Sequence, residues 1–276
     1  MREIFKRSSD KHGMELSTRE LRNLKEVHQA FLPKICPHCR DISISAKNVM
    51  KFDLGGDFYD FTKPEPKLWG FWIGDATGKG IVASSVSAVM YGLLHHMCKE
   101  KASPGEVVAE LNEALYHLNT RVSDLAYPFS ATSFYGVFDS ESGSFKYASA
   151  GHPAPIMLDA KTSEVTQLSP TGPPLGFSME WSSGEVTIPS IIGKKIVMFT
   201  DGLLYGKQNV GFTTSELTEF ISSLSSLSAG DIVDTVFSET EKRFKGNFED
   251  DLTIITADFS NMPACKSCVA KDATAN

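Results

Sequence analysis

The chain has 276 residues, 41% of them hydrophobic, and its 34 acidic and 27 basic side chains give a formal net charge of −7. This length suits one large domain with extensions. The acidic balance, without clustered Lys and Arg, argues against a nucleic-acid partner. No run approaches the roughly 18 apolar residues of a membrane span, and no apolar signal core follows the charged start of the chain. We therefore expect a cytoplasmic protein without a membrane segment.

The N-terminal region has the pattern of an amphipathic helix. Ser17 and Glu20 have the spacing of a capping box, apolar residues then recur at steps of three and four as far as Phe31, and Pro33 ends the pattern. We expect residues 1–33 to form a helical arm that packs on its own domain or pairs with a partner helix.

Two pairs of cysteines lie near opposite ends of the chain, Cys36 with Cys39 and Cys265 with Cys268. Without a secretory signal, all five cysteines are expected to be reduced thiols. A shared zinc site stays open as an alternative, because four thiolates suit tetrahedral zinc. A thiol redox protein is a further alternative, although the βαβ pattern that usually surrounds a redox C-x-x-C is missing.

From Asp41 onward the pattern changes to short apolar or alternating runs separated by turn residues, which predicts strands. A link as short as the one between Asp139 and Gly143 cannot hold a helical crossover, so neighbouring strands should pair antiparallel. The expected strands are 41–46, 57–62, 68–74, 130–138, 144–149, 154–159, 164–168, 184–189, 195–200 and 252–258.

Helices are expected to interrupt the strands in two places. Residues 81–99 and 104–119 form one predicted pair, and Ser103 has the position of an N-cap for the second member. A later pair begins with a capping box at Thr213 and has an apolar inner face over 232–244. Helix pairs grouped with hairpins are typical of an α+β fold in which helices cover a β-sandwich.

Four aspartates stand at the ends of expected strands beside glycine or another acid, namely Asp57, Asp75, Asp201 and Asp250. Each one alone is equally well explained as a turn or cap residue. If they converge, their carboxylates would repel one another unless cations neutralised them. Hard carboxylate oxygens suit Mg²⁺ or Mn²⁺ rather than zinc, so convergence predicts a divalent-metal site.

Two other motifs carry less weight. Gly74 to Gly80 looks like a phosphate-binding loop, but only three residues separate its first two glycines, and Gly80 rather than Ser or Thr follows Lys79. A nucleotide-binding P-loop is therefore excluded. His152, the single histidine in an Ala-Gly-His-Pro segment, is expected to be a strand-end residue rather than a catalyst.

Eight motifs in order resemble the PPM-type metal-dependent protein serine/threonine phosphatases, in the SpoIIE-like branch of RsbU-like sigma-factor regulators. The resemblance runs from about Glu26 to Asp258. No single motif is decisive, but the ordered set is highly specific. The motifs are Phe31-Leu32-Pro33, Gly55-Gly56-Asp57-Phe58-Tyr59-Asp60, Gly74-Asp75-Ala76-Thr77-Gly78-Lys79-Gly80, Phe134-Tyr135-Gly136-Val137, Ala150-Gly151-His152-Pro153, Gly172-Pro173-Pro174-Leu175-Gly176, Thr200-Asp201-Gly202 and Asp250-Asp251-Leu252-Thr253.

The resemblance implies an αββα sandwich of two mainly antiparallel sheets flanked by helix pairs. We expect residues 34–260 to form this phosphatase domain and residues 261–276 to be a disordered tail.

The resemblance also implies a centre of two Mn²⁺ or Mg²⁺ ions. By analogy, Asp75 would bridge both ions, Asp201 and Asp250 would complete one site, and Asp57 with the Ala76 carbonyl would hold the other. Such a pair lowers the pKa of a bridging water, orients it for in-line attack on phosphorus and offsets charge on the phosphoryl oxygens.

The family's usual substrates are phosphoserine or phosphothreonine on STAS-domain anti-anti-sigma proteins, so the resemblance implies a bacterial partner-switching pathway in signal transduction. Control is expected from an activating partner or a homodimer, acting through the N-terminal helix and the helices at 81–99 and 104–119. The helix at 81–99 follows Asp75 closely, so a shift of that helix would move a metal ligand.

Two points stay open. Asp251 is the adjacent alternative to Asp250 as a ligand. The family commonly has Asp-Gly-x-Thr-Glu-Ala where this chain has Asp201-Gly202-Leu203-Leu204-Tyr205-Gly206, which lacks the glutamate. The alternative function is therefore a pseudophosphatase, a binding and regulatory module that keeps the fold and turns over poorly.

Overall fold

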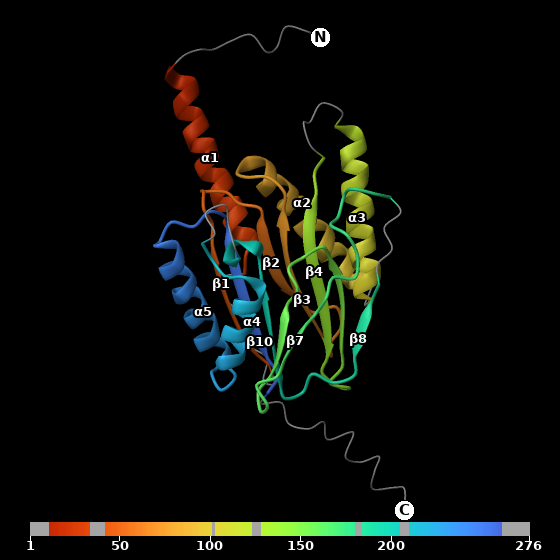
Figure 1. Ribbon diagram of the computed structural model, residues 1–276. Helices are drawn as coiled ribbons and strands as arrows, with labels where there is room; N and C mark the ends of the chain where they lie inside the picture. The colour runs from red at the N-terminus through yellow and green to blue at the C-terminus, as the bar shows by residue number, and fades with distance from the viewer. Residues whose placement is uncertain are drawn as a thin grey trace, which may run out of the picture.

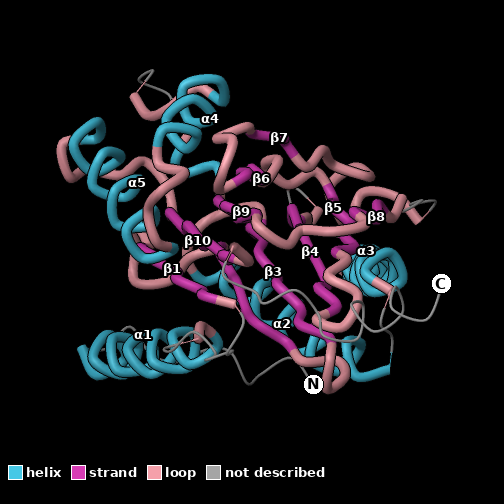
Figure 2. The backbone as a smooth tube through the Cα atoms, turned by 90° about the horizontal axis from the view of Figure 1, so that it is seen from below, coloured by secondary structure: helices cyan, strands magenta, loops and turns pink. Residues whose placement is uncertain are grey.

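Two five-stranded antiparallel sheets lie face to face in the computed structural model, and a pair of helices covers the outer face of each (Figure 1). The structure describes residues 11–33, 42–100, 103–122, 128–179, 184–204 and 210–260. Seen from below, α2 and α3 lie on one side of the two sheets and α4 and α5 on the other (Figure 2). The predicted α+β class and the αββα layering are confirmed.

The first sheet has the strand order β2-β3-β4-β5-β8. Short links join β2 to β3 and β4 to β5, which explains why these two pairs are antiparallel. Helices α2 and α3 pack on its outer face. The elements are β2 (Asp57–Thr62), β3 (Leu68–Ala76), α2 (Ile81–Glu100), α3 (Pro104–Arg121), β4 (Ala131–Asp139), β5 (Phe145–Ala150) and β8 (Val186–Ile188).

The second sheet has the order β1-β10-β9-β6-β7, so the first and last strands of the sandwich are neighbours. Helices α4 and α5 pack on its outer face, and each begins with a side-chain cap, from Thr213 and Ser228. The elements are β1 (Ser43–Val49), β6 (Ile156–Asp159), β7 (Val165–Gln167), β9 (Lys194–Phe199), the short 3-10 helix η1 (Asp201–Leu203), α4 (Thr214–Ser223), α5 (Ala229–Phe244) and β10 (Leu252–Asp258).

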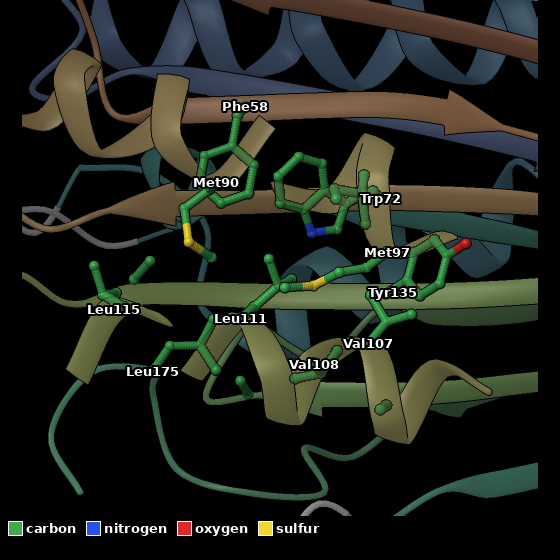
Figure 3. Packing of buried hydrophobic residues seen from close by; sticks show 14 of the residues in the cluster. Phe58, Trp72, Met90, Met97, Val107, Val108, Leu111, Leu115, Tyr135 and Leu175 are labelled. Atoms are coloured by element: carbon green, nitrogen blue, oxygen red, sulfur yellow. The ribbon is translucent and has the colours of Figure 1, made fainter. Parts of the chain in front are cut away.

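Alternation along the strands divides the core into three apolar layers. Trp72 and Tyr135 point from the first sheet toward α2 and α3, where Figure 3 shows them with Met90 and other buried residues. Phe71 and Phe134, one position away on the same strands, point between the two sheets instead. Successive side chains of a strand face opposite sides, so both faces of each sheet are buried. A third layer lies under α4 and α5.

Helix α2 is apolar over most of its length, and Ile81–Cys98 is long and apolar enough by composition to cross a membrane. Its inner residues, such as Met90 and Leu94, are fully buried against the first sheet. A helix that packs on a core meets the same compositional test, so this feature is weak evidence for a membrane span.

Helix α1 (Lys11–Phe31) begins before the predicted cap, so the capping box at Ser17 is wrong. The residues from Lys11 to Ser17 contain no proline and include good helix formers, which lets the helix extend backward. The C-terminal end of α1 packs on the domain, where the rings of Phe31 and Tyr91 lie 5.1 Å apart. Its N-terminal half projects away from the sheets (Figure 1).

All ten predicted strands are present; the bounds of 57–62 and 252–258 are as predicted, and the other eight have shifted ends. The largest shift is in the first one, predicted over 41–46 and observed as Ser43–Val49. Pairing with β10 continues as far as Val49 opposite Leu252, which extends the strand beyond its alternating pattern. The predicted tail, 261–276, lies outside the described residues.

Candidate functional site

The four singled-out aspartates lie at the same end of the two sheets. Asp57 begins β2 and Asp75 stands near the end of β3, and the antiparallel register makes them direct partners. In the facing sheet, Asp201 follows β9 and Asp250 precedes β10, two strands that pair with each other. The sandwich therefore brings together acids that are far apart in the sequence.

Asp57 is almost fully buried, and its carboxylate bridges the two sheets. Its Oδ2 accepts hydrogen bonds from Thr200 Oγ1 at 2.8 Å and from Thr253 Oγ1 at 2.5 Å, both on the second sheet. Asn48 Nδ2 in turn donates to Thr253 Oγ1 at 2.7 Å. Burial raises the pKa of Asp57 to about 8, repulsion from Asp251 adds to this, and the two hydroxyls oppose it.

Repulsion among the carboxylates also raises the pKa values of Asp75 and Asp201. Burial is the largest cause for both. For Asp75 the next causes are the charges of Asp57, Asp201 and Asp250, while for Asp201 the charge of Lys79 lowers the pKa. Acids that raise one another's pKa values in this way favour a bound cation, because a cation offsets the same repulsion.

Asp251 has a different role from its neighbour Asp250. Its two carboxylate oxygens accept hydrogen bonds from the backbone N–H groups of Lys51 and Gly56, each at 2.8 Å, and it is only 8% exposed. Asp250 is about half exposed, and its Oδ2 lies 2.7 Å from Lys79 Nζ. This difference favours Asp250 over Asp251 as a cation ligand, because Asp251 holds the loop before β2 in place.

The glycines of the motifs allow the close approach of these acids. A Cβ on Gly56 would lie 2.6 Å from Asp75 Oδ1 and still closer to the Ala76 carbonyl oxygen. A Cβ on Gly202 would overlap the carbonyl of Asp251. A side chain at position 56 would therefore fill the space beside two of the predicted ligand oxygens, from Asp75 and Ala76.

The donor set fits a hard divalent cation, since it consists of carboxylates and one backbone carbonyl. Among the described residues, no three Asp, Glu, His or Cys side chains are arranged closely enough to hold a metal ion as they stand. Three of the acids have other partners: Asp57 Oδ2 accepts hydrogen bonds from two threonine hydroxyls, Asp251 accepts from backbone amides, and Asp250 pairs with Lys79.

His152 lies behind the acids rather than among them. It is buried, and its Nδ1 lies 2.9 Å from Oγ1 of Thr132, the residue that pairs with Asp75 across β3 and β4. Burial lowers the pKa of His152 to about 3, and the backbone of Phe199 opposes this. The ring is therefore neutral at physiological pH, which suits packing rather than proton transfer.

Sequence reasoning missed three polar partners of the acids: Thr200, Thr253 and Lys79. Each stands within three residues of a singled-out acid or in the same glycine-rich segment, so proximity in sequence was an available signal. Each of them binds a carboxylate oxygen of a residue that is distant in the sequence and lies at the end of the facing sheet, so the sequence alone does not give the pairing.

The other motifs have simpler outcomes. Leu203, in the segment that departs from the family pattern, is fully buried in the layer under α4 and α5. Tyr205, which stands where the family has glutamate, lies outside the described residues, as do the four cysteines of the C-x-x-C pairs. Cys98 is a free, buried thiol in the core.

The profile of the family described as "Stage II sporulation protein E (SpoIIE)" matches residues 65–260. The chain is 25% identical to "Phosphoserine phosphatase RsbU" of Bacillus subtilis over 237 residues, covering 86% of this chain and 69% of RsbU. It is 24% identical to "Phosphoserine phosphatase RsbP" of the same organism over 154 residues, covering 55% of this chain and 37% of RsbP.

Solved structures with the same fold include the SiaA-PP2C domain of Pseudomonas aeruginosa, with a TM-score of 0.72, 17% identity and coverage of 88% of this chain and 97% of that one. The RsbU and RsbW domains of Rv1364c from Mycobacterium tuberculosis give a TM-score of 0.63 and 24% identity, and the match covers 81% of this chain and 61% of that one. RsbX in complex with magnesium gives a TM-score of 0.59 and 18% identity, and the match covers 80% of this chain and 96% of that one. At these identities the likeness shows the fold.

Substitution of Gly56 tests the close packing at the acids. In Gly56→Ala the new Cβ would push against Asp75 and the Ala76 carbonyl, so we expect unfolding free energy to fall by about 1–3 kcal/mol. Gly92→Ala is the matched control, because nothing lies within 4 Å of its added Cβ and a helical alanine stabilises by about 0.5–1 kcal/mol. Urea unfolding measures the unfolding free energy of both variants. Equal values for Gly56→Ala and Gly92→Ala would contradict the close packing at Gly56.

The raised pKa of Asp57 predicts a pH dependence for the metal-free protein. The folded pKa, about 8, lies above the ordinary value of 3.8, so stability is lost as pH rises toward 8. The unfolding free energy in chelator should therefore fall with rising pH below about 8 and level off above it. Between about pH 7 and 8 the fall can be assigned to the carboxyl group, because histidines are mostly neutral in both states. Asp57→Asn should flatten this slope while keeping an acceptor for the two threonines. An unchanged slope in the variant would show that Asp57 is ionised throughout.

Proposed function

The chain belongs to the SpoIIE family of PP2C-type serine phosphatases, whose profile covers most of it, and from this premise we propose that it removes phosphate from serine or threonine of another protein with the help of divalent cations. The observation that carries the proposal is the gathering of Asp57, Asp75, Asp201 and Asp250 at one end of the sandwich, where burial and the charges of neighbouring aspartates raise the pKa values of the first three. Carboxylates that repel one another in this way favour a bound cation, because a cation offsets the repulsion.

We assign the ligand roles as follows. Asp75 would be shared between two cations, with Asp201 and Asp250 completing one site and Asp57 and the Ala76 carbonyl completing the other. When bound, the cations supply an activated water and offset the charge of the phosphoryl group. Mn²⁺ and Mg²⁺ both suit these oxygens, and the magnesium complex of the structurally similar RsbX supports divalent-cation dependence.

The residues around the ligands hold them in position. Thr200 and Thr253 orient the carboxylate of Asp57 from the facing sheet. Asp251 holds the backbone of Gly56, directly before Asp57, through the 2.8 Å hydrogen bond to its N–H. These contacts restrict Gly56 and Asp57 at the start of β2, so the carboxylate of Asp57 is oriented by residues around the proposed ligands.

For the substrate we propose a phosphorylated STAS-domain protein in a bacterial partner-switching pathway. The similarity to RsbU and RsbP, both named phosphoserine phosphatases, supports a phosphoserine substrate. The pairing of RsbU and RsbW domains in Rv1364c supports a place in such a pathway. The proposed location is the cytoplasm, where these partners would be found, and the proposed control is an activating partner or homodimer that contacts α1, α2 and α3.

Hydrolysis of p-nitrophenyl phosphate tests the cation centre. We expect activity that requires Mn²⁺ and falls more than about 100-fold in Asp75→Asn and in Asp201→Asn, because each variant loses a ligand. Asp234→Asn is the matched control, since this acid is 74% exposed on α5, pairs with Lys47 and is not one of the proposed ligands. An inactive wild type at high Mn²⁺ would favour the pseudophosphatase.

A second assay addresses the substrate. Incubated with Mn²⁺, the chain should remove phosphate from a phosphorylated STAS-domain protein, and the Asp75→Asn variant should not. Loss of the phosphate can be followed by intact-protein mass spectrometry. Rapid hydrolysis of p-nitrophenyl phosphate with no loss from any phosphorylated STAS protein would contradict the substrate proposal and leave the phosphatase proposal standing.

A further inference from the structure

Lys79 lies in the loop between a strand that carries a ligand and the helix that follows it. The loop joins β3, which holds Asp75 and Ala76, to the first residue of α2, Ile81. Both neighbours of Lys79 are glycines in the left-handed region, with φ of 112° at Gly78 and 65° at Gly80. Such a conformation favours glycine, so the chain can turn tightly on either side of Lys79.

The ammonium group of Lys79 reaches across to the facing sheet. Its Nζ lies 2.7 Å from Asp250 Oδ2 and 3.3 Å from the carbonyl oxygen of Glu249. It also lowers the pKa of Asp201, so its charge acts on two of the proposed ligands. This ion pair connects the loop before α2 with Asp250, which precedes β10.

The ion pair is exchangeable because both partners are solvated. The side chains of Lys79 and Asp250 are 48% and 49% exposed. Exposed ion pairs contribute little to stability and are screened by salt, so they break easily. The oxygen that Lys79 occupies belongs to the carboxylate that would hold a divalent cation, and one oxygen cannot easily serve both cations because like charges repel.

We propose that Lys79 is an internal counter-cation of the acidic site, which competes with the divalent cation for Asp250 and leaves when that cation binds. The inference rests on the proposed cation centre and adds a residue that regulates it. Two consequences follow. Lys79 lowers the affinity for the cation, and cation binding frees the start of α2 from β10, which links occupancy of the site to the helix beside it.

Lys51 offers a matched control for the charge alone. Its Nζ donates to the same carbonyl, that of Glu249, at 2.6 Å, but makes no ion pair with Asp250. Its backbone N–H binds Asp251, and this bond survives a change of side chain. Replacing Lys51 therefore removes one positive charge close to the acids without releasing the proposed ligand.

The test is calorimetric titration of the full chain with Mn²⁺, for wild type, Lys79→Met, Lys79→Arg and Lys51→Met. Lys79→Met should bind Mn²⁺ about 2- to 5-fold more tightly, the range of an exposed ion pair. Lys79→Arg should stay near wild type because arginine can pair with Asp250, and Lys51→Met should change affinity less than Lys79→Met. The gain in Lys79→Met should shrink at high salt.

Hydrogen exchange gives a second readout that does not depend on activity. The amide of Ser84 bonds to the carbonyl of Gly80 in the first turn of α2. Saturating Mn²⁺ should raise exchange of this turn in wild type to the level of Lys79→Met.

The outcomes separate this inference from the proposed function. If wild type binds no Mn²⁺, both are wrong. If wild type binds Mn²⁺ but Lys79→Met binds it with equal or lower affinity, only the role of Lys79 is wrong. Equal tightening in Lys79→Met and Lys51→Met would also overturn the inference, because general charge would then explain the effect.

Discussion

Mutual repulsion among carboxylates is the constraint on which the functional end of this protein depends. Asp57 and Asp75 are contributed by β2 and β3, while Asp201 follows β9 and Asp250 precedes β10, so strand pairing within each sheet holds the acids at one end of the sandwich. Burial makes this repulsion costly, as the raised pKa values of the first three indicate. The surrounding contacts can be understood as ways of keeping these acids in place: threonine hydroxyls for Asp57 and an ammonium group for Asp250.

The same contacts connect the two sheets. Apolar packing holds the sheets face to face along most of their length, but at the functional end the interface becomes polar. There Asp57 of the first sheet binds Thr200 and Thr253 of the second, and the amide of Thr253 also donates to the hydroxyl of Thr200. A sliding of one sheet against the other would therefore break hydrogen bonds to a buried acid, which is costly.

Helix α1 contacts α2 and lies close to this end of the molecule. His28 is buried on α1 and its Nε2 lies 3.3 Å from Ser87 Oγ on α2. Burial lowers the pKa of His28, while the charge of Asp251 and the backbone of Gly55 raise it, which places the ring close to the loop that leads into Asp57. Control by a partner that binds α1 would thus have a short path to the acids, through α2 and through this loop.

The sequence by itself determined the strands, the helix pairs, the family resemblance and the identity of the acids, because alternation, capping and short motifs are local properties. The tertiary structure decided the bounds of elements that local patterns left wrong. Helix α1 begins at Lys11 rather than after a cap at Ser17, and β1 extends to Val49 because β10 pairs with it. It also distinguished Asp251, bound to backbone amides, from Asp250, paired with Lys79. Two adjacent aspartates are equivalent in a sequence, and only the strand ends that surround them give each a different partner.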